Sequence, residues 1–363
     1  MEIEFYQAEC GDAARIRFLG NDNKHHNIFI DSGFDKTFRF VLGDKIKQLE
    51  KAGEQIDLWI ITHIHDDHIG GVLKYLNVIT SGEFNDIVKQ WYYNVPRFYP
   101  FISNNYKSSI SKAVSICQGD TLFEYLTNNE KLADTDITSE LPILDLFGLK
   151  ITVLSPSIEK LNQLRNKYSI DSNNELEKSE SNTISEAKRA KENDYTIKLI
   201  DFNIENFVED KSIENGSSIS MITEYNNKKI LWLGDSHPSD VIISLLKLGY
   251  SKQNQFECDW VKVAHHGSIG NNSNELYNLI KCNNYFFSAN GENKHNLPFK
   301  ECISRIVRNE NRNINSVYNL YFTYDNETLR SIFKIDGEDI FREFNFTSNF
   351  SSSKSLSFGF EKT

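Results

Sequence analysis

The sequence lacks any apolar run approaching the roughly 18–20 residues that a membrane-spanning helix requires. Its first residues, MEIEFYQAEC, alternate as a strand does and lack the basic and then apolar regions of a secretory signal. Cysteine is scarce, odd in number and without CxxC spacing, which argues against a disulfide framework: the five are Cys10, Cys117, Cys258, Cys282 and Cys302. These absences predict a cytoplasmic protein with reduced thiols and no membrane partner.

Positive charge is also in short supply. Lys and Arg total 40 against 51 Asp and Glu, which gives a formal net charge of -11. A protein held on nucleic acid by a broad basic surface needs the opposite balance, because neutralisation of phosphates dominates such binding. A nuclease is not excluded, since bound divalent cations can supply positive charge locally.

The overall composition is typical of a large soluble protein, with 39% hydrophobic and 25% charged residues among 363. We expect a single domain over 1–340, interrupted at about 158–214 by a polar insertion rich in Lys, Glu, Asn and Ser. The insertion is a candidate contact for a protein partner. Residues 341–363, which are rich in Ser and Phe, are expected to form a C-terminal extension or tail.

Several segments predict secondary structure. Residues 3–18 and 26–33 are expected as the two strands of an opening hairpin, and 44–53 as a helix that ends at Gly53. The C-terminal segment LYFTYDNETLRSIFKIDGEDIFREFNF predicts strands linked by turns at DN and DG. Three apolar strands, IDLWIIT, KKILWLGD and DWVKVA, each end in a loop that carries chemically active side chains.

The first of these loops, in DLWIITHIHDDHIGGV, holds the densest cluster in a chain with only nine histidines. His63 and His65 stand two positions apart, so in an extended segment their side chains project to the same side. Asp67 and His68 follow where the chain turns into a helix. Imidazoles and carboxylates are good ligands for zinc and other divalent first-row metals, and these four residues form two ligand pairs. The Gly-Gly pair that follows would let the backbone approach its neighbours closely.

The HxHxDH spacing followed by GG resembles the metallo-β-lactamase superfamily of metallohydrolases. NIFIDSG, with Asp31, is similar to the family's early strand, whose aspartate buttresses the metal loop. KKILWLGDS and VKVAHHGS are similar to the segments that carry a bridging aspartate and the last metal histidine. Together they most resemble the ComEC-type branch, named after the nuclease-like domain of bacterial DNA-uptake channels. The resemblance covers about 1–80, 150–156 and 215–310, and it implies an α/β fold, a four-layer αββα sandwich with two mixed sheets face to face.

The resemblance also implies a two-metal site whose ligands come from the three loops: His63, His65, Asp67, His68, Asp235 and His265. The first metal would be held by His63 and His65, the second by Asp67 and His68, and Asp235 would bridge them. Either histidine of the VAHHGS segment could complete the second site. His265 is taken as the ligand and His266 as a neighbouring contact. The implied catalytic residues are Asp67, Asp235, His266 and His295.

This sequence departs from the family at one position. Many members carry a further histidine for the first metal before the bridging aspartate, but no histidine lies between His68 and His237. The corresponding segment is ENGSSIS, where Asn215 or a water must serve. ComEC-like relatives tend to have asparagine there. With fewer strong ligands, the first metal site is expected to be the weaker one.

The remaining polar candidates carry less weight. His295, in GENKHNLP, could protonate a leaving oxygen or stabilise a developing oxyanion if it points inward. His237 could line the site or occupy an exposed turn, and Asp66 is expected to be at the surface or to support its neighbours. His25 and His26 are expected to face solvent. Five aromatic residues could stack on bases, but core packing is the favoured interpretation for them: Trp91, Tyr92, Tyr93, Phe98 and Tyr99.

The chemistry that this set implies is hydrolysis, because two divalent metals sharing a water lower its pKa and neutralise charge in the transition state. Zinc is the first expectation and manganese the second, since histidine and carboxylate ligands do not choose sharply between them. By resemblance, the substrate is a phosphodiester in nucleic acid or a nucleotide. The alternatives are hydrolysis of a small ester, thioester or lactam, and an interaction protein with a vestigial site.

Overall fold

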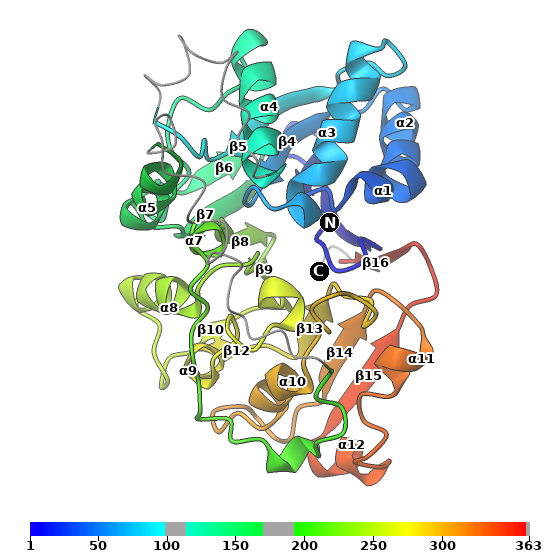
Figure 1. The fold of residues 1–363 in the computed structure, drawn as a ribbon, viewed down its shortest axis with the longest axis vertical. Coiled ribbons are helices and arrows are strands. Elements are labelled where there is room, and N and C mark those ends of the chain that lie inside the picture. The colour runs from blue at the N-terminus through cyan, green and yellow to red at the C-terminus, as the bar shows by residue number, and fades with distance from the viewer. Residues whose placement is uncertain (99–113, 170–191, 361–363) are drawn as a thin grey trace.

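The protein folds into two β-sheets that pack face to face, with helices on their outer sides (Figure 1). This computed structural model describes residues 1–98, 114–169 and 192–360. The expected four-layer αββα sandwich of the metallo-β-lactamase type is confirmed. No helix among the described residues is both long enough and apolar enough to cross a membrane.

The first sheet has the strand order β16-β1-β2-β3-β4-β5. Its strands are β1 Glu2–Tyr6, β2 Ala14–Leu19, β3 His25–Ile30, β4 Ile56–Ile61, β5 Val88–Tyr93 and β16 Ser355–Gly359. The hairpin between β2 and β3 is confirmed. Its first strand, which was expected to cover 3–18 without a break, is instead two antiparallel strands, β1 and β2. The chain leaves the sheet between them, at residues 7–13, in a loop that contains Gly11 and Asp12.

The second sheet has the order β15-β14-β13-β11-β9-β8-β7-β6. Its strands are β6 Leu144–Leu146, β7 Leu149–Ser155, β8 Ser220–Tyr225, β9 Lys228–Trp232, β11 Trp260–Lys262, β13 Asn284–Phe287, β14 Tyr318–Phe322 and β15 Phe346–Phe350. A separate short pair consists of β10 Phe256–Glu257 and β12 Ile280–Lys281. From β9 to β15 the pairing is parallel, so these strands all end at the same edge of the sheet.

Helices cover the outer face of each sheet. Those at the top of Figure 1, on the first sheet, are α1 Asp35–Thr37, the π-helical turn Phe38–Leu42, α2 Gly43–Lys51, α3 Asp66–Thr80, α4 Val114–Asn128 and α5 Ile158–Ser169. Those associated with the second sheet and its loops are α7 Ile213–Gly216, α8 Pro238–Lys247, α9 Asn274–Asn278, α10 Lys300–Val307, α11 Glu327–Arg330 and α12 Asp339–Glu343. The helix expected over 44–53 is therefore confirmed as α2. In contrast, α11 and α12 lie where turn-linked strands were expected.

Three buried apolar clusters separate the four layers, which is why the layers hold together. One lies between the sheets and includes Ile60, Met221 and Trp260. The other two lie beneath the outer helices, around Trp59 on the first sheet and Val261 on the second. Adjacent residues of one strand fall in different clusters, as the alternation of side chains along a strand requires.

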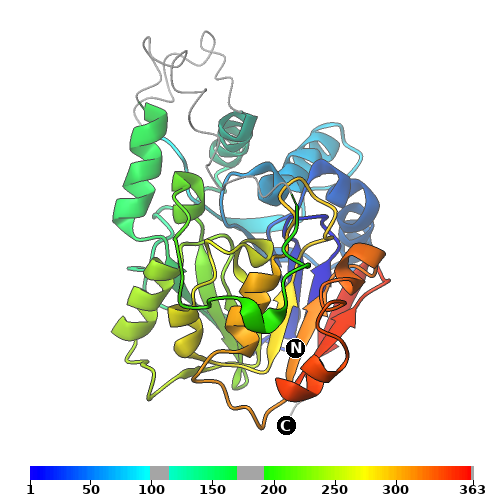
Figure 2. The same ribbon diagram turned by 60° about the horizontal axis from the view of Figure 1, so that its bottom comes forward.

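The two described ends of the expected polar insertion are packed rather than solvated; residues 170–191 lie outside the described residues. The first end is α5, whose Leu161 and Leu164 are buried against the first sheet. The second end returns over α10, and Figure 2 shows this green segment running past the orange helix. There Lys300 Nζ donates to the carbonyl oxygen of Ile197 at 2.7 Å, and Arg308 donates to that of Leu199 at 3.0 Å. Basic side chains at the start of α10 and directly after its end therefore fix part of a segment whose composition predicted a solvated excursion.

The described part of the expected C-terminal tail consists largely of sheet strands. β15 pairs with β14 at the edge of the second sheet, and β16 pairs with β1 at the edge of the first. The main chain can satisfy its hydrogen bonds in this way even where the side chains are Ser, Asn and Phe. The last strand thus ties the two sheets together instead of hanging free.

Candidate metal centre

Three loops that follow strands meet at one edge of the sandwich. The loop after β4 carries His63 and His65, the loop after β9 carries Asp235, and the loop after β11 carries His265 and His266. The backbone joins the two sheets here, because Ile219 N donates to Thr62 O at 2.9 Å. Segments that are far apart in the sequence therefore converge at the positions that the strand-ending motifs predicted.

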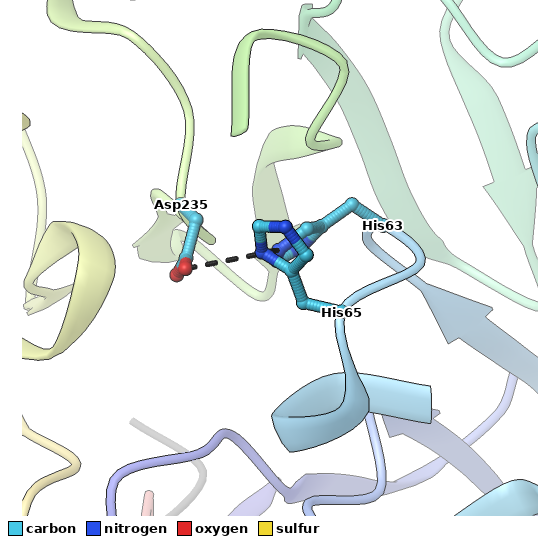
Figure 3. Close-up of side chains that lie close together, drawn as sticks. All are labelled: His63, His65 and Asp235. Carbon is cyan, nitrogen blue, oxygen red and sulfur yellow. Dashed lines mark hydrogen bonds and ion pairs between the residues drawn. The ribbon is translucent and has the colours of Figure 1, made fainter. Parts of the chain in front are cut away.

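The first group of side chains consists of His63, His65 and Asp235, whose ligand atoms lie within 4.8 Å of one another. Figure 3 shows the two imidazoles turned toward the Asp235 carboxylate. His63 Nε2 lies 3.7 Å from Asp235 Oδ2 and 3.0 Å from His65 Nδ1. Burial, together with the neighbouring imidazoles, places the pKa of His63 well below its ordinary value. The ring is therefore neutral at pH 7, which is the form that binds metals.

The second group consists of Asp67, His68 and His266, again with ligand atoms within 4.8 Å. His68 Nε2 lies 3.4 Å from Asp235 Oδ1, and His266 Nε2 lies 3.4 Å from Asp67 Oδ2. His266 Nε2 also lies 3.7 Å from Asp235 Oδ1. Asp235 thus stands between the groups with Oδ2 toward the first and Oδ1 toward the second, which is the geometry expected of a bridging carboxylate.

The atoms that face this space suit a bound cation. His68 Nε2, His266 Nε2 and both oxygens of Asp235 are buried without a hydrogen-bond partner in the described part of the chain. Burial opposes ionisation of Asp235, but the imidazoles of His265 and His68 hold its pKa well below the ordinary value. A buried carboxylate and unpaired imidazole nitrogens are costly unless an ion or a proton compensates them. This donor set fits divalent first-row metals.

The backbone of the HHG turn is strained, and the strain aims its two imidazoles in different directions. His265 and His266 have positive φ angles of 43° and 54°. Non-glycine residues in this conformation cost free energy and occur mainly where function requires them. The strain places His266, rather than its neighbour, beside Asp67 and His68. His265 instead points its Nε2 to within 3.5 Å of Asp235 Oδ2, on the side of the first group.

A polar network orients His265. Its Nδ1 donates to Asn271 Oδ1 at 2.8 Å, which leaves Nε2 free to face Asp235. Asn271 in turn donates to the carbonyl oxygen of Asp235 at 2.9 Å and to Asp210 Oδ2 at 3.3 Å. Asn215, at the position of the missing family histidine, is buried, and its Oδ1 has no hydrogen-bond partner among the described residues. Its amide nitrogen donates to Asp210 at 2.5 Å.

Asp31 supports the metal loop as the resemblance implied. Its Oδ2 accepts from His68 Nδ1 at 2.7 Å, and Oδ1 accepts from the backbone N of Thr62 at 2.7 Å. This leaves Nε2 of His68 facing the centre and fixes the ring. The Gly-Gly pair after the motif is needed because a Cβ on Gly71 would lie 2.3 Å from the carbonyl oxygen of Ser32.

Sequence reasoning did not identify four residues that line or support the centre: Asp12, Asp210, Lys262 and Asn271. Asp12 lies close enough to His68 and Asp235 to form a third group of possible ligands. A lysine inside the apolar strand DWVKVA was the one available signal, because such a residue is seldom buried without a partner. Asp210 and Asn271 sit in polar stretches where nothing in the pattern distinguishes them from surface residues.

The structure also places the lesser candidates. His295 is exposed on the loop between β13 and α10. Partial burial and the charge of Lys294 lower the pKa of His295, and Asp67 acts in the opposite direction, so the imidazole lies within electrostatic reach of the centre. His237 is buried at the start of α8 and accepts a hydrogen bond from Lys160 Nζ at 3.1 Å, so it does not occupy an exposed turn.

Three other expectations concern residues away from the ligand groups. Asp66 is exposed in the first turn of α3 and accepts from Gln118 at 2.5 Å, in agreement with the expected surface position. The expectation that His26 faces solvent is wrong, because it is 3% exposed and contacts Asp22 and Asp57. Trp91 and Tyr93 are buried in the core, which leaves their rings unavailable for stacking on bases; Tyr99 lies outside the described residues.

Residues 18–80 match the family model described as the metallo-beta-lactamase superfamily. The matched range runs from β2 to α3 and includes the segment with His63, His65, Asp67 and His68. This match supports the superfamily, whose members are mostly hydrolases, and it does not distinguish its branches. The comparison with curated proteins found no match.

The comparison with solved structures found matches of low sequence identity, among them the following three. A mutant of the CmlA beta-hydroxylase is 10% identical with a TM-score of 0.40, and the match covers 98% of this chain but 53% of that one. This chain thus spans about half of the hydroxylase. The metallo-beta-lactamase fold protein YhfI from Bacillus subtilis is 11% identical, with a TM-score of 0.39 and 99% of both chains covered. Zn(2+)-bound PqqB from Methylobacterium extorquens is 9% identical, with a TM-score of 0.42 and coverage of 99% of this chain and 100% of that one.

Proposed function

We propose that this chain is a hydrolase that uses two divalent cations, zinc or manganese, and that it cleaves phosphodiester bonds in nucleic acid or a nucleotide. The observation that carries the proposal is the position of Asp235, which turns one carboxylate oxygen toward each of two ligand groups. The groups have the composition and spacing of a pair of cation sites. Without a cation, protons on the buried imidazoles of His68 and His266 would have to compensate the carboxylates, as their raised pKa values indicate.

In this proposal His63, His65 and Oδ2 of Asp235 hold the first cation. The second is held by Asp67, His68, His266 and Oδ1 of Asp235. His265 completes the first site in place of the histidine that many relatives carry, because its Nε2 faces the same oxygen as His63 does. The two histidines of the HHG turn thus serve different cations, and each is fixed through its Nδ1.

Bound at these groups, two divalent cations would supply an ionised water as the nucleophile and neutralise charge on the electrophile. The protein's own side chains orient the reactants. The side chains of Asp67 and His265 are 22% and 24% exposed, whereas those of His63, His68 and Asp235 are almost fully buried. The substrate therefore approaches past Asp67 and His265.

The loop between β13 and α10 supports an anionic substrate. It carries Lys294 and His295, and the charge of Asp67 acts on His295. A lysine and an imidazole on this loop can contact a phosphoryl oxygen, and the neutral imidazole of His295 can donate its N–H hydrogen bond to the leaving oxygen. The ligand and turn motifs that resemble the ComEC-type branch also favour a phosphodiester.

A substrate panel with purified protein tests the proposal. The protein is loaded with zinc or manganese and incubated with single- and double-stranded DNA and RNA, cyclic dinucleotides, and an ester, a thioester and a lactam. We expect cleavage of at least one phosphodiester substrate, and we expect it to disappear after treatment with a chelator. His65→Ala and Asp67→Ala serve as site variants, and the exposed Lys281→Ala serves as a surface control.

Three results would contradict the proposal. Activity that is unchanged in both site variants would come from a contaminant. Turnover of the ester, thioester or lactam without any phosphodiester cleavage would keep the hydrolase but reject the substrate class. Protein that binds no cation and cannot be reconstituted would reject the whole assignment.

A further inference from the structure

A buried ion pair joins the two sheets directly behind the metal centre. Asp12 lies in the loop between β1 and β2 of the first sheet, and Lys262 is the last residue of β11 in the second. Lys262 Nζ contacts Asp12 Oδ2, and the two side chains are 4% and 8% exposed, respectively. Neither residue is a metal ligand in the proposed function, although Asp12 lies close to His68 and Asp235.

A pair in this position needs a reason other than stability. Removing two charges from water costs several kcal/mol per ion, and apolar residues of similar volume often stabilise a fold as well or better. The residues around Lys262 in its strand are apolar, and Trp260 and Val261 both belong to buried clusters. An apolar residue at 262 would continue that pattern, so the lysine has a specific partner rather than a general packing role.

Asp12 contacts two members of the second ligand group. Its Oδ1 lies 3.3 Å from Nδ1 of His266, beside the Ser288 carbonyl oxygen that accepts the hydrogen bond of this nitrogen at 3.0 Å. Its backbone N donates to the carbonyl oxygen of Asp67 at 3.1 Å. The neighbouring Gly11 allows this close approach, because a Cβ there would lie 2.2 Å from the same carbonyl oxygen. A shift of Asp12 would therefore move both His266 and Asp67.

The second imidazole of this group is connected to the same place. A small cavity of about 20 Å³ is lined by Asp12, Lys262 and Asp31. Asp31 is the carboxylate that accepts from Nδ1 of His68. The carboxylates of Asp12 and Asp31 and the ammonium group of Lys262 thus line one cavity between the sheets. The cavity is large enough for about one water.

We propose that Asp12 and Lys262 act together as positioning residues for the second cation. Lys262 fixes the Asp12 carboxylate, and Asp12 holds the ring of His266 and the backbone of Asp67 in the geometry that binds the cation. Neither touches the substrate. This inference rests on the proposed function because it presupposes the second cation site. The first site, which is on the other side of Asp235, does not depend on the pair.

The test is cation binding by Lys262→Met and Asp12→Asn, measured by equilibrium dialysis against buffered free zinc followed by elemental analysis. We expect the affinity for the second cation to fall about 10- to 100-fold, as for other partners that orient a metal ligand. The first cation should stay bound, and its retention shows that the fold is intact. Lys300→Met is the matched control, because Lys300 forms an equally buried pair with Asp336 on the outer side of the second sheet. It should keep both cations.

The order of action is tested by the double variant. If Lys262 works through Asp12, Lys262→Met should add little further loss of affinity in the Asp12→Asn background. Fully additive losses would overturn that order. If Lys262→Met does not fold, Lys262→Gln, which keeps a hydrogen-bond donor but not the charge, carries the same test together with Asp12→Asn.

The outcomes separate this inference from the proposed function. Wild-type protein that binds no cation would reject the proposed function. Wild-type protein with two cations and variants with unchanged affinities would reject the positioning pair alone. An equal loss of the second cation in Lys300→Met would also reject it, because the effect would then be a general consequence of a broken buried pair.

Discussion

The ligands proposed for the first and the second cation lie on opposite sides of Asp235, called here the first side and the second side. The two sides contain similar residue types, but different groups support them. On the second side, Asp31 accepts a hydrogen bond from Nδ1 of His68, and Nδ1 of His266 donates to the carbonyl oxygen of Ser288 at 3.0 Å. The Asp12 carboxylate lies 3.3 Å from the same nitrogen of His266, so each imidazole has a carboxylate near its Nδ1. On the first side, the side-chain amide of Asn271 holds His265. Among the described residues, the side chain of His63 forms hydrogen bonds only with Thr62 and His65. The second side is also more deeply buried, apart from Asp67.

This difference predicts different affinities. A carboxylate behind a ligand imidazole fixes its orientation and increases its basicity, and a neutral amide does so less. Burial also excludes competing water. We therefore infer that the second side binds its cation more tightly and that the first side exchanges more readily, in agreement with the weaker first site expected from the missing histidine. The predictions below test this comparison, beginning with the change that should abolish it.

Asp235→Asn should have the largest effect, because it removes the one group that both sides share. An amide has one coordinating oxygen and no charge, so both cations should bind far more weakly. We expect activity to fall by more than about 100-fold, beyond the loss caused by an outer partner of a ligand. Elemental analysis after dialysis measures occupancy. Asp336→Asn, which removes another buried carboxylate, is the control and should keep both cations. Retention of two cations by Asp235→Asn would show that the sides are independent.

Removal of cations with a chelator should distinguish the sides in the wild-type protein. The first cation should leave at a lower chelator concentration, which produces a species with one cation per chain. In His266→Ala the second cation should leave at the same chelator concentration as the first or at a lower one, because the second side has then lost one of its ligands. His63→Ala should leave the tightly held second cation in place. Simultaneous release of both cations from the wild-type protein would contradict the comparison.

His265→Ala should have a smaller effect, confined to the first side. Its Nε2 faces Asp235 Oδ2, but His63 and His65 remain to hold the cation. We expect about a tenfold lower affinity for the first cation and no change in the second. Asn271→Ala, which removes the acceptor that orients Nδ1 of His265, should give a weaker form of the same result. If His265→Ala released the second cation instead, the assignment of the two turn histidines would be reversed.

The sequence was sufficient for the side of the site that is local in the chain. His63, His65, Asp67 and His68 lie within six consecutive residues that join β4 to α3, and their spacing alone predicted two ligand pairs. The ends of β9 and β11 could also be identified, because apolar strands lead directly into Asp235 and the HHG turn. The sandwich followed from resemblance, and the strand pairing confirms it.

The supporting residues could not be predicted because they depend on tertiary approach. Asp12 reaches the centre only because the first predicted strand is broken at residues 7–13. Asp210 comes near the end of a segment whose polar composition indicated a solvated insertion. The separation of His265 from His266 depends on two positive φ angles, and no sequence pattern specifies these for histidine.

The smallest expected effect concerns α7, which borders the first side and places Asn215. Burial alone would raise the pKa of Glu214 in this helix, but Lys167 and the hydroxyl of Tyr168 lower it to about 2. Lys167 Nζ donates to its carboxylate at 2.6 Å. Because the folded pKa is below the ordinary value of 4.5, the ionised carboxylate stabilises the fold at neutral pH, and this contribution is lost as pH falls toward 2.

Glu214→Gln should therefore lower the free energy of unfolding at neutral pH by no more than about 3 kcal/mol, the upper bound that the pKa shift sets. The difference from the wild-type protein should shrink as the pH falls from about 5 to about 2. Urea unfolding of cation-free protein across this range measures it, and the exposed Glu159→Gln should change stability by less than about 0.5 kcal/mol. The negative charge of Glu214 also acts on His65, a ligand of the first side only. At neutral pH the variant should therefore lose affinity for the first cation and keep the second; equal weakening of both would mean that α7 supports the whole centre and not one side of it.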